Sequence, residues 1–177
     1  YGGCFLTQVP NFTVTVLNGH PRLISILLGA FIVGVALGSL LCNRLSRGVI
    51  EPGIVPLGAI GLSIFAFDLS FASIAYQETH GSLSAVMPMQ FLGLDGGPHI
   101  LIDLVLIGMF GGFFIVPLNS MVQQRTAANN RARVLSVNAI MNAAYMVGGS
   151  LLGIFFLSIL GWSIMSFFIT VAVMNVL

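Results

Sequence analysis

Long apolar runs constrain the fold of this chain more than any other feature of its sequence. A helix of about 20 apolar residues crosses the hydrocarbon core of a bilayer. Six such segments are predicted, at residues 1–17, 23–42, 54–76, 100–122, 134–160 and 163–177. Because the apolar runs are continuous and do not alternate with polar residues, we expect helices and not the strands of a membrane barrel.

Charged side chains are too scarce for a water-soluble domain. Only 6% of the 177 residues are charged, whereas soluble domains carry roughly a quarter. The net charge is +1, which offers no basic surface to nucleic acid. The composition therefore excludes a soluble enzyme, a disordered tail and a disulfide-rich module. It predicts an all-α, multi-span membrane protein whose first partner is the lipid bilayer.

Both ends of the sequence fall within apolar runs. The chain starts at Tyr1 and is still apolar at Leu177. We therefore expect a segment of a longer protein, cut within helices at both ends, and a signal peptide is not indicated. The two cysteines, Cys4 and Cys42, fit no metal or redox spacing and are expected to be small buried residues.

The arginines predict how the segments are oriented. Two lie between the second and third segments and three between the fourth and fifth, namely Arg44, Arg47, Arg125, Arg131 and Arg133. The connections on the other side contain Arg22 alone, and the long connection at residues 77–99 contains no basic residue except histidine. The positive-inside rule therefore places the arginine-rich connections in the cytoplasm. With six spans, both ends of the segment would be cytoplasmic as well.

Small residues recur at four-residue spacing in three of the segments. The rows are Ala30, Gly34 and Gly38; Gly108 and Gly112; and Gly149 and Gly153. Such rows let two helix backbones approach closely within a membrane. We expect them to mark helix contacts.

Asp68 is an acidic residue deep within the third predicted span, and the predicted topology gives no reason for a charge at that position. An ionisable side chain within a span is costly unless it faces the interior of the bundle. Two alternatives remain open. Asp68 either lines a cavity, where it binds an ammonium headgroup or a coupling cation, or it pairs with a neighbouring helix. Asp103 is expected about one turn inside the fourth segment, where the helix dipole accounts for it, and His99 beside it is expected to be structural.

The fifth segment carries polar residues along one helical face. Asn138, Asn142, Tyr145 and Gly149 follow one another at steps of four, three and four. This face either binds a polar headgroup or forms hydrogen bonds between helices. Asn119 is expected near the cytoplasmic mouth of the same cavity. No nucleophile–base pair, metal-ligand cluster or phosphate loop is recognisable, so no enzyme activity, metal or cofactor is predicted.

Two loops resemble motifs of the major facilitator superfamily. Residues 38–48 (GSLLCNRLSRG) resemble its cytoplasmic loop, in which a Gly precedes an acidic residue, then Arg and Gly. Here Gly38, Arg44 and Arg47 match, while Cys42 or Asn43 stands at the acidic position. The string from Arg131 and Arg133 (RARVLS) resembles the entry to the eleventh helix of the superfamily. These residues are candidates for a conformational role.

Residues 38–63 and 117–152 resemble, more narrowly, the lysophospholipid transporter family. The resemblance implies the second six-helix half of a twelve-helix transporter, with the first half of the same protein as its partner. It further implies transport of a lysophospholipid, such as lysophosphatidylethanolamine, across the bacterial inner membrane. Re-acylation would follow in an acyltransferase or acyl–acyl-carrier-protein synthetase domain outside this segment. The alternatives are a transporter of another small solute or drug, and a membrane scaffold for an acyltransferase.

Overall fold

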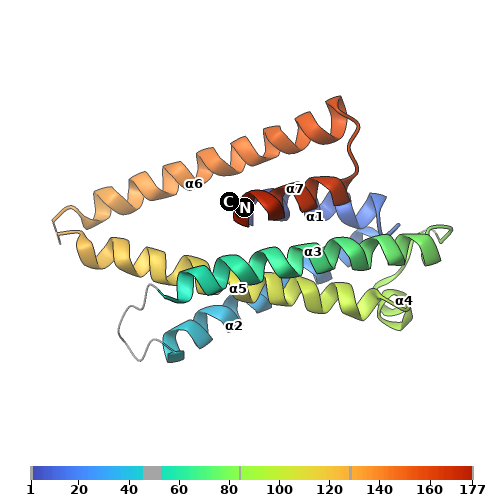
Figure 1. Ribbon diagram of the computed structural model, residues 1–177, viewed down its shortest axis with the longest axis horizontal. Coiled ribbons are helices and arrows are strands. Elements are labelled where there is room, and N and C mark those ends of the chain that lie inside the picture. The colour runs from blue at the N-terminus through green and yellow to red at the C-terminus, as the bar shows by residue number, and fades with distance from the viewer. Residues whose placement is uncertain (1, 46–52, 84, 128, 177) are drawn as a thin grey trace.

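The computed structural model describes residues 2–45, 53–83, 85–127 and 129–176, and these ranges fold into helices joined by short connections (Figure 1). Helix α6 continues directly into a π-helical turn, η1. In chain order the elements are α1 (Gly2–Thr15), α2 (Pro21–Leu45), α3 (Ile54–His80), α4 (Pro88–Gly93), α5 (Gly97–Arg125), α6 (Arg131–Ile154), η1 (Phe155–Ile159) and α7 (Ile164–Val176).

Four of these helices are long and apolar enough to cross a membrane. They are α2, α3, α5 and α6 with its η1 extension, and they coincide with the second to fifth predicted segments. Helices α1 and α7 occupy the first and last predicted segments but contain only 14 and 13 residues, fewer than the roughly 20 that a span needs. The all-α prediction is confirmed, and candidate spans are found for four of the six predicted segments.

The helices form a packed group on one side and a diverging helix, α6, on the other (Figure 1). Helix α5 lies at the centre of the packed group, between α2 and α3, and α7 packs on α3. Helix α6 makes its main contacts with α1 and diverges from α5 after the connection that joins them (Figure 1).

Helices α2 and α5 approach each other closely through the predicted rows of small residues. A Cβ atom added to Gly34 would lie 3.0 Å from Cα of Val105, and one added to Gly112 would lie 2.9 Å from the backbone nitrogen of Ser39. A Cβ at Gly38 would overlap the backbone of the facing helix in the same way. The predicted contact rows are therefore confirmed for this pair of helices.

The third row of small residues packs against α1. Gly149 and Gly153 are buried, and a Cβ added to Gly153 would collide with the side-chain amide of Gln8. This contact holds one end of α6 against the bundle.

A hydrogen-bonded cluster joins α3 to α7. The Asn175 amide donates to the carbonyl oxygen of Ala59 and to Oγ of Ser63, both at 2.9 Å. The Ser63 hydroxyl lies 3.3 Å from the carbonyl oxygen of Ala172 and can donate to it. In an apolar environment such a polar cluster fixes how far one helix can slide along the other.

We expect Asn175→Leu to lower the free energy of unfolding by about 1 kcal/mol, because hydrogen bonds between membrane helices contribute about 0.6 kcal/mol on average and up to about 1.7 kcal/mol. The matched control is Asn11→Leu, since the exposed Asn11 amide bonds to Gln8 within its own helix. Unfolding of the full chain in mixed detergent micelles measures both variants. Equal losses in the two would contradict an interhelical role for Asn175.

The connection predicted at residues 77–99 is shorter than expected and partly helical. Helix α3 continues to His80, α4 lies within the connection, and α5 already begins at Gly97. The backbone of Val86 exchanges hydrogen bonds of 3.0 Å with Asn18 and His20 in the α1–α2 connection. Phe91 of α4 is fully buried. This connection therefore closes one end of the bundle.

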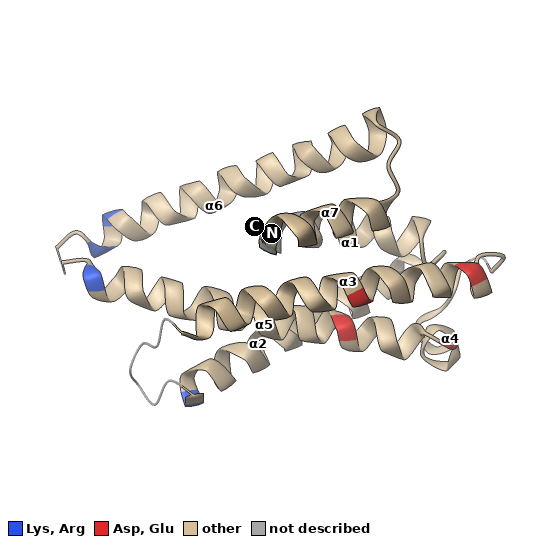
Figure 2. Cartoon of the chain, in the orientation of Figure 1, with Lys and Arg blue, Asp and Glu red and all other residues tan. Residues whose placement is uncertain are grey.

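Basic and acidic residues are separated along the long axis of the molecule in Figure 2. The basic residues that the figure shows lie where α2 and α5 end and α6 begins, while the acidic residues lie in the half that contains α4. Of the predicted cytoplasmic arginines, Arg47 lies outside the described residues. The structure thus places the arginine-bearing ends of these three helices on one side of the molecule, as the arginine distribution predicts.

Candidate functional site

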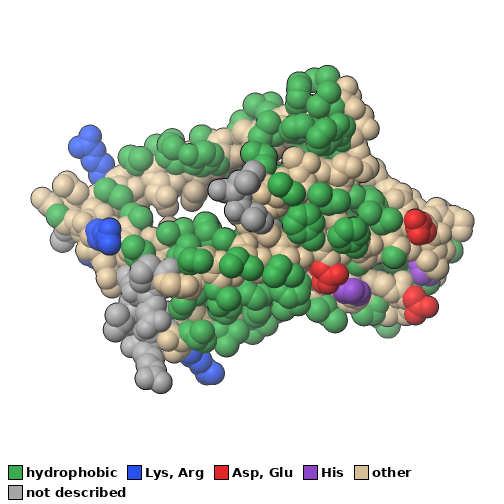
Figure 3. Space-filling model, viewed as in Figure 1, with side chains coloured by type: hydrophobic (Ala, Val, Ile, Leu, Met, Phe, Trp, Pro, Cys, Tyr) green, Lys and Arg blue, Asp and Glu red, His purple; other side chains and the backbone are tan. Residues whose placement is uncertain are grey.

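A cavity of about 810 Å³ lies between α6 and the packed helices. Residues 31–36 of α2 and 107–115 of α5 contribute to its wall, and both stretches lie near the midpoints of their helices. The space-filling view shows the surface hollowed between α6 and the packed helices (Figure 3). The volume falls within the range of about 300–1,000 Å³ that small-molecule sites occupy.

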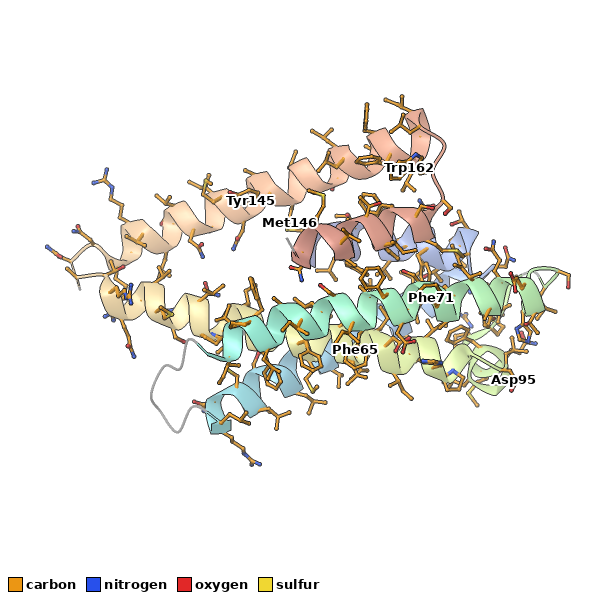
Figure 4. All side chains as sticks on the ribbon, in the orientation of Figure 1. Phe65, Phe71, Asp95, Tyr145, Met146 and Trp162 are labelled. Atoms are coloured by element: carbon orange, nitrogen blue, oxygen red, sulfur yellow. The ribbon has the colours of Figure 1, made fainter. Side chains whose placement is uncertain are left out.

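The wall of this cavity is apolar, with a few polar groups from α6 and α7. Aromatic and aliphatic side chains such as Phe31 and Phe114 form most of it. The polar contributions come from Asn142 and Tyr145 of α6 and from Asn175 of α7. Figure 4 labels Tyr145 beside Met146 on α6. Within the described residues, no charged side chain lines the cavity.

The polar face predicted on the fifth segment is divided between two environments. Asn142 and Tyr145 line the cavity. Asn138 instead donates to Oδ1 of Asn119 at 3.5 Å, a long hydrogen bond that connects α6 to α5. The structure therefore shows a hydrogen bond between helices at Asn138. Binding of a headgroup by Asn119, Asn138, Asn142 or Tyr145 stays a prediction.

Asp68 lies outside this cavity, in a second polar group formed with α5. Nε2 of His99 donates to Oδ2 of Asp68 at 3.1 Å and lies 3.7 Å from Oδ2 of Asp103. The side chains of His99 and Asp68 are about half exposed, at 54% and 46%, whereas that of Asp103 is 1% exposed. The structure therefore shows the pairing with a neighbouring helix, and a substrate contact by Asp68 stays a prediction.

The two carboxylates of this group repel each other when both are ionised. The ligand atoms of Asp68, His99 and Asp103 all lie within 4.8 Å of one another. Two unit charges no more than 4.8 Å apart repel by about 3.5 kcal/mol or more for an effective dielectric constant of about 20. Asp103 Oδ2 is buried and has no hydrogen-bond partner among the described residues. Protonation of one carboxyl group, protonation of the imidazole or a bound cation relieves this repulsion.

This group is not predicted from the sequence, and Asp103 lies deeper within its helix than expected. Helix α5 begins at Gly97, so Asp103 lies nearly two turns inside, beyond the first turn in which the helix dipole acts. One signal was available, since His99 and Asp103 are four residues apart and share a helical face. Asp68 is 31 residues away from His99, and only the packing of α3 on α5 brings it near.

The residues that resemble the superfamily loop motifs lie at helix ends. Gly38 is buried against α5, while Asn43 and Arg44 are exposed in the last turn of α2. Arg131 and Arg133 are exposed in the first turn of α6, where two positive charges oppose the helix dipole. Their conformational role stays a prediction.

Of the two cysteines, Cys42 is buried beside Ile54 and Phe113, as expected for a small packing residue. The side chain of Cys4 lies outside what the structure describes.

The described residues therefore form an all-helical structure with four candidate membrane spans. It has an uncharged cavity beside the midpoints of α2 and α5 and a separate carboxylate–histidine group. Comparisons of the chain with protein-family models, with curated proteins and with solved structures found no match.

Proposed function

We propose that this chain is the second six-helix half of a major facilitator transporter that carries a lysophospholipid across the bacterial inner membrane. One observation carries the proposal, namely the apolar cavity at mid-depth with amides and a phenol on one side. Transporters of this kind place their substrate site near the midplane of the membrane, between two repeats. The arginine-rich side of the bundle is then cytoplasmic.

The cavity has the chemistry that an amphiphilic molecule requires. Its aromatic and aliphatic wall suits an acyl chain, because burying apolar surface there is favourable. The amides of Asn142 and Asn175 can donate to and accept from a glycerol hydroxyl or an ester. Because the wall described above is uncharged, the phosphate of the headgroup is bound by the other half of the transporter.

Helix α6, which diverges from the packed helices, lies at the surface along which the two halves move in the proposed mechanism. Much of the surface of α6 is exposed and apolar, with Ile140, Val147 and Leu151 among its exposed side chains. This surface faces the first half of the transporter across the substrate path. Rocking of the two halves about the cavity exposes the site to each leaflet in turn, and an acyltransferase domain re-acylates the product on the cytoplasmic side.

Uptake of labelled lysophosphatidylethanolamine by spheroplasts tests this proposal directly. The full-length protein is expressed in cells that lack their own uptake of this lipid. We expect uptake several-fold above an empty-vector control. Uptake equal to that control, from protein shown to be present in the membrane, would contradict the lipid transport function.

The uncharged cavity also favours a second candidate, a transporter of the same fold for an apolar solute or drug. Competition separates the two. If lysophosphatidylethanolamine is the substrate, an unlabelled excess of it abolishes uptake of the labelled lipid, and an equal concentration of an uncharged drug-like amphiphile has little effect. Stronger inhibition of uptake by the drug-like amphiphile than by lysophosphatidylethanolamine would favour the second candidate.

A further inference from the structure

We propose that Asp68, His99 and Asp103 form a binding site for one divalent transition-metal ion of the zinc class, held between α3 and α5. The proposal is independent of the transport function, because none of the three residues lines the cavity. It depends on the distances between the three side chains and on the burial of Asp103, whose Oδ2 atom has no hydrogen-bond partner among the described residues.

The three side chains converge on one point from two helices. The same atom of His99, Nε2, lies 3.1 Å from the nearer oxygen of Asp68 and 3.7 Å from that of Asp103. Tetrahedral ligands about 2.1 Å from a zinc ion lie about 3.4 Å apart. Two of the three separations already match this value, and all three ligand atoms lie within 4.8 Å of one another. The three ligand atoms are therefore close enough together for one ion to bind all of them.

The buried carboxylate of Asp103 points to a ligand independently of that geometry. Its side chain is 1% exposed, and its Oδ2 atom, which faces His99, has no hydrogen-bond partner among the described residues. Buried carboxylates are normally paired, hydrogen-bonded or bound to metal. A divalent ion supplies the missing contact and neutralises both carboxylates at once.

The type of ligand selects the class of ion. Imidazole nitrogen together with carboxylate oxygen suits zinc and its neighbours among the transition metals, whereas magnesium and calcium prefer oxygen ligands throughout. Three protein ligands leave one tetrahedral position for water. The exposure of His99, in the first turn of α5, gives the ion a path of entry.

Calorimetric titration of the full chain, purified in detergent and stripped with chelator, tests the site with zinc and with magnesium. We expect one zinc ion per chain and at least tenfold weaker binding of magnesium. His99→Ala and Asp68→Asn should each weaken zinc binding at least tenfold. The matched controls are His20→Ala and Asp95→Asn, which make the same changes outside the group, and Asp95 is labelled near α4 in Figure 4.

Stability gives a second readout that does not depend on heats of binding. A saturating ligand stabilises the folded state, so zinc at a hundredfold excess over its dissociation constant should raise the unfolding temperature by about 5 °C or more. The rise should disappear in Asp103→Asn and in Asp68→Asn. Because Asp68 is half exposed, Asp68→Asn remains informative even if the buried substitution prevents folding. Absence of zinc binding, or equal binding in variants and controls, would overturn the proposal.

Discussion

Gly34→Ala should lower the free energy of unfolding by about 3 kcal/mol, although it adds a single methyl group. The added Cβ would lie 3.0 Å from Cα of Val105 and closer still to the carbonyl of that residue. Backbone cannot move aside as a flexible side chain can, so α2 and α5 must separate along their interface. Overpacking of this kind typically costs about 1–3 kcal/mol, and backbone contact places this case at the upper end.

The matched control is Gly29→Ala on the same helix. A Cβ at Gly29 meets no atom within 4 Å, and alanine is favoured over glycine in a helix interior by up to about 1 kcal/mol. The two substitutions therefore change the free energy of unfolding in opposite directions, although each replaces glycine with alanine. Unfolding of the full chain in mixed detergent micelles measures both, and a loss of similar size in each would contradict the close packing of α2 on α5.

Gly111→Leu should reduce lysophospholipid uptake at least tenfold while the protein remains folded. Gly111 lines the cavity, and a Cβ there has its nearest neighbour, Cδ2 of Leu62, at 3.9 Å. A leucine side chain consequently extends into open space and occupies the volume that an acyl chain would fill. Spheroplast uptake normalised to the amount of protein in the membrane measures the effect.

Gly29→Leu provides the control for this substitution, because it adds the same side chain in open space outside the cavity wall. Its uptake should equal that of the wild type. Normal uptake by Gly111→Leu would show that the cavity is not on the substrate path. Equal losses in both variants would show that the added side chain acts through something other than the cavity.

The contact role of the small-residue rows was predictable because it depends on local spacing, whereas the pairing of α2 with α5 was not. Residues four apart lie on one face of a helix, so the rows containing Gly34, Gly38 and Gly112 are visible in the sequence itself. The long apolar helices were predictable for the same reason, since run length alone decides whether a helix can span a bilayer.

The carboxylate–histidine group was not predictable in this way. Its assembly depends on the rotation and relative height of two helices, which no local pattern specifies for Asp68 and His99. The division of the polar face of α6 is a similar case. Whether Asn138 bonds to Asn119 or faces a cavity with Asn142 depends on how far α6 diverges from α5, and that angle is set by contacts distant in sequence, such as Gly153 against Gln8.

Photo-crosslinking of the substrate tests the central claim, that the cavity binds the acyl chain, most directly. The probe is lysophosphatidylethanolamine with a photoreactive group near the end of its acyl chain, and the target is the full chain in membranes. We predict adducts on residues 31–36 and 107–115, suppressed by excess unlabelled lysolipid and absent in Gly111→Leu. Adducts confined to lipid-exposed positions, with no effect of the competitor, would contradict the claim.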